Sequence, residues 1–148
     1  AHVVTTASAR NKAFVESLGA DEHHDYQEAS LYQRLQQDYL AGFDIIVDTV
    51  GQHTIENSLA LLADGGRLVS IVDMAVPQNL LNGWQANAEL HFVFTTQSAQ
   101  RLSAIASMVD AGGIKPILER TMGLNDIVEA HELIEAGSRQ GKIAITID

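Results

Sequence analysis

Short apolar runs alternate with stretches of helical periodicity along nearly the whole chain. This alternation is typical of repeated strand and helix units around a largely parallel sheet. Residues 43–48 are apolar almost throughout, so we expect a strand that is buried on both faces. The pattern therefore predicts an α/β fold with a doubly wound parallel sheet.

The individual elements follow from these runs. Strands are expected at residues 3–6, 23–26, 43–48, 67–72 and 90–94. Residues three or four positions apart mark the helical faces between and after them: Phe14, Val15 and Leu18; Leu31, Leu35 and Tyr39; Ile55, Ser58, Leu59 and Leu62; Leu102, Ile105, Ala106 and Val109. The third of these helices is expected to end at the glycine break 64–66, and residues 73–87 are interpreted as a loop.

The last stretch of the chain has a different character. Ile143, Ile145 and Ile147 alternate with other residues, as in a strand with only one buried face. A helix is expected from about Asn125, with His131 as a packing residue on its mainly apolar face. We therefore predict a separate sheet here, with a domain boundary between residues 1–114 and 115–148.

Composition excludes several classes of function. The chain has 148 residues, 46% of them apolar, which is enough for a globular core. A formal charge of −10 with nine Lys and Arg disfavours nucleic-acid binding, since that requires clustered cations. No apolar run is long enough to cross a bilayer and the first residues do not resemble a signal peptide, so we expect no membrane partner and a cytoplasmic location. The absence of cysteine removes disulfides and thiolate nucleophiles.

Five short strings occur in one order and at one spacing. They are Ser-Leu-Gly-Ala-Asp at 17–21, Asp-Tyr at 25–26, Asp-Ile-Ile-Val-Asp-Thr-Val-Gly at 44–51, Gly-Gly-Arg-Leu-Val-Ser at 65–70 and Gly-Lys-Ile at 141–143. Together they resemble the C-terminal half of the zinc-free, quinone-oxidoreductase-like medium-chain dehydrogenases/reductases, over about residues 3–147. The resemblance implies a Rossmann-like dinucleotide-binding domain at 1–114 and a segment at 115–148 that returns to the catalytic domain.

The sequence departs from this family at its start. A complete member would have a first strand and a glycine-rich turn upstream, where backbone N–H groups bind the pyrophosphate. The glycines at 65–66 lie between a predicted helix and a predicted strand, which is the wrong context for that turn. Because the first strand is central in the usual order, we expect the sheet to be split without it.

The end of the first predicted strand indicates which cofactor is preferred. Dinucleotide folds that bind NAD have an acidic residue here, which bonds the ribose 2′-OH. This sequence instead has Ser8, Arg10, Asn11 and Lys12, which suit a 2′-phosphate, so we predict NADPH. The alternative is that Ser8 only caps its helix while the two cations face solvent. Tyr26 matches a family tyrosine near the adenosine end, although such a residue is as often simple packing.

The remaining candidate residues come from the resemblance and lie at predicted carboxyl ends of strands, where open sheets bind ligands. They are Thr49, Val50 and Gly51, then Ile71 and Val72 near the ribose, and Val93 and Phe94 on the nicotinamide side. Asp48 is tempting as a general base. An aspartate that ends a buried strand is more often a cap or turn residue, so we do not assign it to catalysis.

No pattern of metal ligands or of a nucleophilic triad is visible. His23 and His24 are adjacent, and therefore point to opposite sides of an extended chain. No other histidine pair has the helical spacing of a zinc site, and no nucleophile elbow is present. Hydride transfer needs neither, because the cofactor carries the chemistry.

The resemblance implies an NADPH-dependent enzyme that transfers hydride to a small acceptor, a quinone or an α,β-unsaturated carbonyl. We expect this chain alone to be inactive, because the phosphate loop and most of the acceptor pocket would lie outside it. The alternatives are a non-catalytic nucleotide-binding or interaction module and a methyltransferase-type fold. The cations at 10 and 12 argue against the last of these.

The strand at 90–94 predicts a homodimer. It is apolar and aromatic and lacks the Lys and Pro residues that protect exposed sheet edges. Related proteins pair such strands about a twofold axis. The alternative is that residues 73–87 fold over this edge and leave a monomer.

Overall fold

The computed structural model describes residues 1–51, 53–73, 77–137 and 140–147. The chain divides into two compact units, Ala1–Thr96 and Gln97–Asp148. The helix α5 (Ala99–Asp110) is grouped with the second unit, although the predicted boundary would place it in the first. That boundary, after residue 114, stays a prediction.

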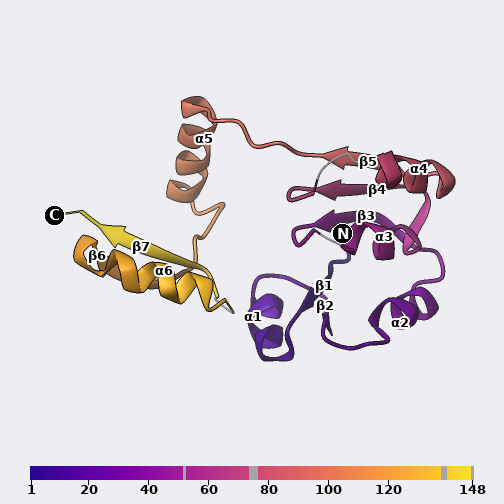
Figure 1. The fold of residues 1–148 in the computed structure, drawn as a ribbon, viewed down its shortest axis with the longest axis horizontal. Helices are drawn as coiled ribbons and strands as arrows, with labels where there is room; N and C mark the ends of the chain where they lie inside the picture. Colours follow the sequence, from indigo (N-terminus) through magenta and orange to yellow (C-terminus); the bar gives the residue numbers. More distant parts are fainter. Residues whose placement is uncertain (52, 74–76, 138–139, 148) are drawn as a thin grey trace. The chain divides into compact units, whose positions relative to one another are not determined.

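The first unit is built from parallel strands with helices between them. Along the chain it contains β1 (Val4–Ala7), the short 3-10 helix η1 (Ala9–Asn11), α1 (Lys12–Ser17), β2 (Glu22–Asp25), α2 (Leu31–Asp38), β3 (Phe43–Asp48), α3 (Thr54–Leu59), β4 (Leu62–Ser70), α4 (Pro77–Gln85) and β5 (Glu89–Phe92). Figure 1 shows β3, β4 and β5 side by side, and all pairs of neighbouring strands are parallel. This confirms the Rossmann-like α/β fold class.

The five strands of this unit do not form one sheet. Among the described residues, β1 pairs with β2, while β3, β4 and β5 form a second sheet in that order. Within the described part of the unit, no strand pairing joins β1 to β3. The expectation that the sheet would be split is therefore confirmed.

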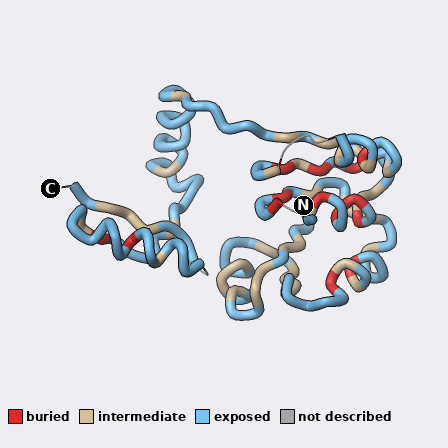
Figure 2. Tube along the Cα trace, in the orientation of Figure 1, coloured by how far each residue is buried: buried red, intermediate tan, exposed pale blue. Residues whose placement is uncertain are grey.

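Two small apolar clusters hold the first unit together. One consists of Leu31 and Leu35 of α2 with Leu61, and the other of Ile55 and Leu59 of α3 with Leu68 of β4. The half-buried Ile46 of β3 packs against both clusters. Figure 2 shows this burial in α2, α3, β3 and β4. Full burial of one such aliphatic side chain stabilises the fold by roughly 1.5–3 kcal/mol.

The expected burial of β3 on both faces is wrong. Ile45 is 58% exposed and Val47 60%, whereas Ile46 and Asp48 on the opposite face are covered. The reason is that α2 and α3 pack on one face only, and β1 is not paired with the free edge of β3.

Two further elements differ from the prediction. Leu62 begins β4 rather than ending a helix, and the glycine break lies inside β4, where the register against β3 shifts. The segment interpreted as a loop contains α4, with Pro77 at its first position, where a missing N–H costs nothing.

Gly83 of α4 lies against β5: a Cβ atom there would be 2.7 Å from Cδ1 of Leu90. Residues 74–76 of the expected loop lie outside the described residues.

The second unit consists of α5, β6 (Leu118–Gly123), the 3-10 helix η2 (Leu124–Asp126), α6 (Ile127–Glu135) and β7 (Lys142–Thr146). The strands β6 and β7 pair in parallel as a sheet of their own, which confirms the predicted separate sheet. The packing role expected of His131 is wrong: His131 is exposed, and Ala130 is the buried residue of α6. Of the helices in the described part of the chain, none combines the length and apolar character that a bilayer-crossing segment needs.

Candidate functional site

The carboxyl ends of β3, β4 and β5 bring three predicted segments to one edge of the sheet. The N–H of Ile71 donates to the carbonyl of Asp48 at 3.1 Å, and the N–H of Val93 donates to the carbonyl of Ser70 at 2.9 Å. These bonds continue the ladders just past the strand ends. Residues 49–51, 71–72 and 93–94 therefore follow neighbouring strands at the same edge, where open α/β sheets bind ligands.

This edge exposes apolar side chains. The exposed fractions are 71% for Val50, 50% for Ile71, 51% for Val72, 49% for Val93 and 88% for Phe94. A group of apolar side chains left in solvent at a strand-end edge is typical of a binding surface.

Gly51 is the buried exception at this edge. Its φ of +81° is a backbone conformation that glycine adopts without strain. A Cβ atom there would lie 3.2 Å from Cγ2 of Val72, so the loop after β3 approaches the end of β4 closely. Thr49 on the same loop is exposed.

A buried carboxylate connects the ends of β3 and β4. Oδ1 of Asp48 accepts from the N–H groups of Val50 and Gly51, both at 3.0 Å, and lies 2.7 Å from the Thr54 hydroxyl. Oδ2 accepts from the hydroxyl of Ser70 at 2.7 Å. Asp48 is 5% exposed and Ser70 is fully buried. The carboxylate thus holds the turn after β3, as its interpretation as a turn residue predicted.

Ser70 also forms hydrogen bonds with the loop after β4. Its hydroxyl oxygen accepts from the N–H of Asp73 at 2.9 Å and from that of Val72 at 3.4 Å, while its proton goes to Asp48. Sequence reasoning missed Ser70, because a serine at a strand end has no distinctive pattern. Its register partner in β3 is Asp48, which only the strand pairing reveals.

The charge state of Asp48 follows from these contacts. Burial raises the pKa of its carboxyl, but the hydrogen bonds from Gly51, Thr54, Ser70 and Val50 outweigh burial, so that the pKa lies below its ordinary value. Asp48 is therefore ionised at neutral pH, with both oxygens already occupied by donors. A carboxylate in this state orients loops and is not poised to remove a proton.

The predicted phosphate-binding residues follow β1. Ser8 occupies the N-cap position of η1, but its hydroxyl makes no capping hydrogen bond, so the expected cap is not formed. Arg10 and Asn11 lie in η1, and Lys12 begins α1 with its Nζ 3.9 Å from Glu16. No acidic residue occurs between positions 4 and 15. The segment therefore presents positive charge at the end of β1.

Tyr26 comes directly after β2 and is 58% exposed. The register pairs Ala7 with Asp25, so Tyr26 follows the strand end next to the Ser8 turn. The structure thus brings two groups to strand ends: Tyr26 with residues 8–12, and residues 49–51 with 71–72 and 93–94. Their roles in binding stay predictions.

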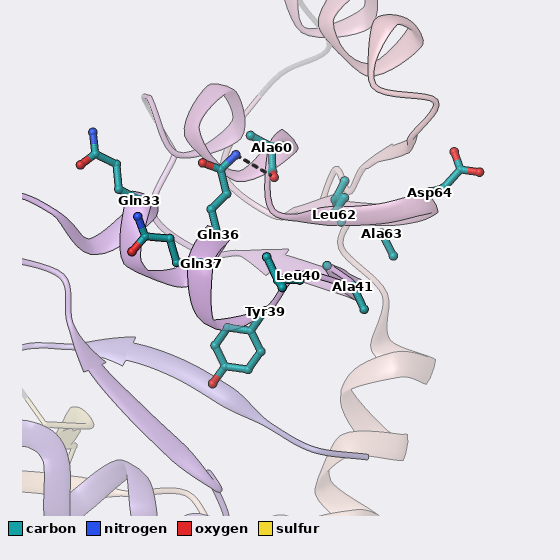
Figure 3. A pocket seen from close by; sticks show the side chains of 11 residues that line it. Gln33, Gln36, Gln37, Tyr39, Leu40, Ala41, Ala60, Leu62, Ala63 and Asp64 are labelled. Atoms are coloured by element: carbon teal, nitrogen blue, oxygen red, sulfur yellow. Dashed lines mark hydrogen bonds between the residues drawn. The ribbon is translucent and has the colours of Figure 1, made fainter.

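Two of the cavities that the described residues of the first unit form differ in their relation to the predicted site. The larger, of about 750 Å³, is lined by glutamines of α2 and by residues 39–42, 60 and 62–64. Nε2 of Gln36 donates to the carbonyl of Ala60 at 3.2 Å (Figure 3). This cavity contains none of the predicted site residues. Tyr39 directs its hydroxyl to Glu22 instead, at 2.6 Å. The smaller cavity, of about 320 Å³, lies between β1 and β3 and includes Thr49 and Val50.

The described residues contain no group of three or more His, Cys, Asp or Glu side chains that could hold a metal ion. His23 places Nε2 2.9 Å from the carbonyl of Ala7, whereas Nδ1 of His24 lies 3.1 Å from Arg34. The two histidines thus have different partners, as expected for neighbours in a strand.

Comparisons with known proteins agree with this fold. Residues 18–145 match the family described as zinc-binding dehydrogenase. The chain is 30% identical to the mouse (Mus musculus) mitochondrial NAD(P)H oxidoreductase RTN4IP1 and 26% identical to that of Danio rerio; each match covers 99% of this chain and 42% or 43% of the relative. A solved quinone oxidoreductase from Coxiella burnetii matches with a TM-score of 0.82 and 26% identity, over 99% of this chain and 45% of that one.

The chain thus spans less than half the length of the relatives it matches. The match to the family covers most of the chain, and the described fold has the parallel strands, intervening helices and strand-end loops of a dinucleotide-binding domain. The chain belongs to the zinc-binding dehydrogenase family, as a C-terminal, cofactor-binding part of a medium-chain dehydrogenase/reductase.

Proposed function

We propose that this chain contributes the NADPH-binding side of an oxidoreductase that transfers hydride to a quinone or an α,β-unsaturated carbonyl. The observation that best supports this proposal is that two kinds of surface lie at strand ends. A positively charged turn follows β1, and an exposed apolar edge follows β3, β4 and β5. The first suits a phosphate and the second suits flat, weakly polar rings.

The residues present fit two ends of the cofactor. The 2′-phosphate would be held by Arg10, Lys12 and the hydroxyl of Ser8, which makes no capping hydrogen bond. Asn11 and Tyr26 would lie beside the adenosine. The edge that contains Val72, Val93 and Phe94 would hold the nicotinamide end, and Gly51 leaves room for close backbone approach. The bound cofactor would supply the hydride. The Asp48–Ser70 connection keeps the two strand-end loops in place.

The acceptor class is supported by the names of relatives. Besides the NAD(P)H and quinone oxidoreductases, an acryloyl-coenzyme A reductase from Sulfurisphaera tokodaii is 30% identical over 68% of this chain and 31% of its own length. Quinones and α,β-unsaturated carbonyls both accept hydride at an electron-poor carbon conjugated to a carbonyl. This shared chemistry is the basis of the proposal.

We expect Arg10→Ala to weaken NADPH binding more than NADH binding. Removal of one charge-assisted contact to the 2′-phosphate costs on the order of 1–3 kcal/mol, or roughly 5- to 150-fold in the dissociation constant. The measurement is the ratio of the two dissociation constants before and after the change. The matched control is Arg67→Ala, since Arg67 is also an exposed arginine but is not among the predicted cofactor-binding residues; it pairs with Glu89 at 2.8 Å. An unchanged ratio in Arg10→Ala would show that Arg10 only faces solvent.

We also propose a homodimer through β5, which lies at the outer edge of its sheet. The backbone N–H of Val93 points to β4, since it donates to the carbonyl of Ser70. Backbone groups alternate in direction along a strand, so the N–H and C=O groups of Leu90 and Phe92 face away from β4. Sedimentation should give a dimer at micromolar concentration, and dilution should speed hydrogen exchange at these two amides but not at Val69 within the sheet. A monomer throughout the concentration series would contradict the proposal.

A further inference from the structure

The imidazole of His23 reaches from β2 to the end of the neighbouring strand β1. In the strand register His23 lies opposite Thr5, but its ring contacts a residue two positions further along. Its Nε2 is 2.9 Å from the carbonyl oxygen of Ala7, the last residue of β1. Because a carbonyl oxygen can only accept, Nε2 must carry the proton and donate it to this bond. The side chain of His23 thus holds the point at which β1 ends.

The positively charged turn begins directly at this point. Ser8 follows Ala7 with extended backbone, and its carbonyl accepts from the N–H of Asn11 at 2.8 Å, which closes the turn of η1. Since the peptide bond is planar, a hydrogen bond on the Ala7 carbonyl restrains the orientation of the whole Ala7–Ser8 peptide. The direction in which the chain leaves β1, and with it the position of Arg10 and Lys12, therefore depends on this contact.

Packing does little to hold the same turn. The helix η1 has no buried residue, and the hydroxyl of Ser8 makes no capping hydrogen bond. The ion pair of Lys12 with Glu16 is long, at 3.9 Å, and both side chains are exposed, so it adds little. In contrast, all four residues of β2 are paired with β1. A bond from a side chain of β2 therefore ties the turn to a well-ordered strand.

The adjacent histidine has different partners. Nδ1 of His24 lies 3.1 Å from Nη2 of Arg34 in α2, and it must accept, because a guanidinium has only donors. The ring of His24 also meets that of Tyr39 edge to face, with 6.4 Å between the ring centres. His24 thus connects β2 to α2, whereas His23 connects β2 to the turn.

We propose that His23 is a positioning residue for cofactor preference: it holds the turn after β1 in the conformation that receives the 2′-phosphate of NADPH. This inference rests on the proposed function, because it takes the turn to be the phosphate site. His23 acts through the backbone and does not itself contact the phosphate. The strand β2 then contributes twice to this end of the site, through His23 and through Tyr26, which follows the strand.

The test uses two probes that differ only in the 2′-phosphate, adenosine 2′,5′-bisphosphate and adenosine 5′-monophosphate. Each is titrated into this chain and followed by NMR, and the ratio of the two dissociation constants measures the preference for the 2′-phosphate. His23→Leu removes the donor, so the preference should fall about 3- to 10-fold, as expected for the loss of one hydrogen bond. His23→Gln places an amide nitrogen near the position of Nε2 and should restore most of the preference.

A second readout needs no ligand. Backbone order parameters of residues 8–12 should fall in His23→Leu and recover in His23→Gln. The matched control is His24→Leu, which changes the neighbouring position of β2 but leaves the contact with Ala7 in place. Its effect falls on the contact with α2, so the ligand preference and the order parameters of the turn should stay as in the unchanged chain.

The outcomes separate this inference from the proposed function. If Arg10→Ala leaves the preference for the 2′-phosphate unchanged, the turn is not the phosphate site and the proposed function fails; the order parameters then still show whether His23 holds the turn. If Arg10→Ala lowers the preference but His23→Leu does not, the positioning role of His23 is overturned. It is also overturned if His23→Gln behaves like His23→Leu, or if His24→Leu has the same effect.

Discussion

Asp48→Asn is expected to lower the free energy of unfolding of the first unit by about 2–4 kcal/mol, since each hydrogen bond to a charged group contributes roughly 1.5–3 kcal/mol. The amide oxygen can still accept from Val50 and Gly51. The amide nitrogen, however, faces the Ser70 hydroxyl, whose oxygen already accepts from Asp73. One buried donor is left without an acceptor. Urea unfolding measures the change.

The pH dependence provides a second readout of the same variant. Because hydrogen bonds lower the pKa of Asp48 in the folded state, the unfolded chain takes up this proton first as the pH falls. The stabilising contribution is therefore fully present above the unfolded value of about 4, and is lost as the pH falls through the lower folded value. Asp48→Asn should remove this part of the acid sensitivity.

Asp44→Asn is the matched control, because Asp44 lies in the same strand with an exposed side chain. It should change stability by less than about 0.5 kcal/mol. If Asp48→Asn behaved like Asp44→Asn in both measurements, the buried carboxylate would not hold the strand ends. NMR shifts confined to residues 49–51 and 71–73 would confirm that the connection acts locally.

The purified chain is expected to show no NADPH-dependent reduction of a quinone or an enone. It spans 42% of the mouse RTN4IP1 relative and 45% of the solved quinone oxidoreductase, and its apolar strand-end edge is open to solvent. Rate acceleration requires groups positioned around the transition state, which an exposed edge does not supply. The measurement is loss of NADPH absorbance with and without the chain.

Binding should be measured on the same samples, because it separates the two proposed classes of function. NADPH-induced shifts at residues 8–12 without turnover fit the cofactor side of an oxidoreductase, and restored turnover on addition of the remaining polypeptide would confirm it. A non-catalytic module would stay inactive in that mixture. Turnover by the chain alone, above the buffer control, would show that a complete acceptor site is present.

Much of the first unit could be predicted from sequence because apolar runs and turn residues are local. The strands β1 to β5 lie within a few residues of their predicted positions, and Asp48 has the turn role expected of a strand-ending aspartate. The helix α4 was missed because Gly83 interrupts its helical pattern. That glycine is explained by Leu90, which leaves no room for a Cβ atom.

Other errors have a common physical cause. Periodicity shows which faces of a strand are apolar, but not which partners are present to cover them. The sequence of β3 therefore predicted two buried faces, although Ile45 and Val47 are exposed. Ser70 was missed for a related reason. Its role depends on Asp48, 22 residues earlier in the chain, and only the pairing of β3 with β4 brings the two together.

The helix α1 has six residues and buries none of them. A helix this short is marginal in water, and with so little packing it can open and close while the larger sheet stays folded. The turn with Arg10 and Lys12 leads directly into this helix. A ligand that fixes the turn must therefore pay the conformational entropy of ordering it, about 1–2 kcal/mol for each backbone residue held. Affinity at this end of the site is thus the difference between charge attraction and local ordering, and substitutions that stiffen α1 can strengthen binding without touching the ligand.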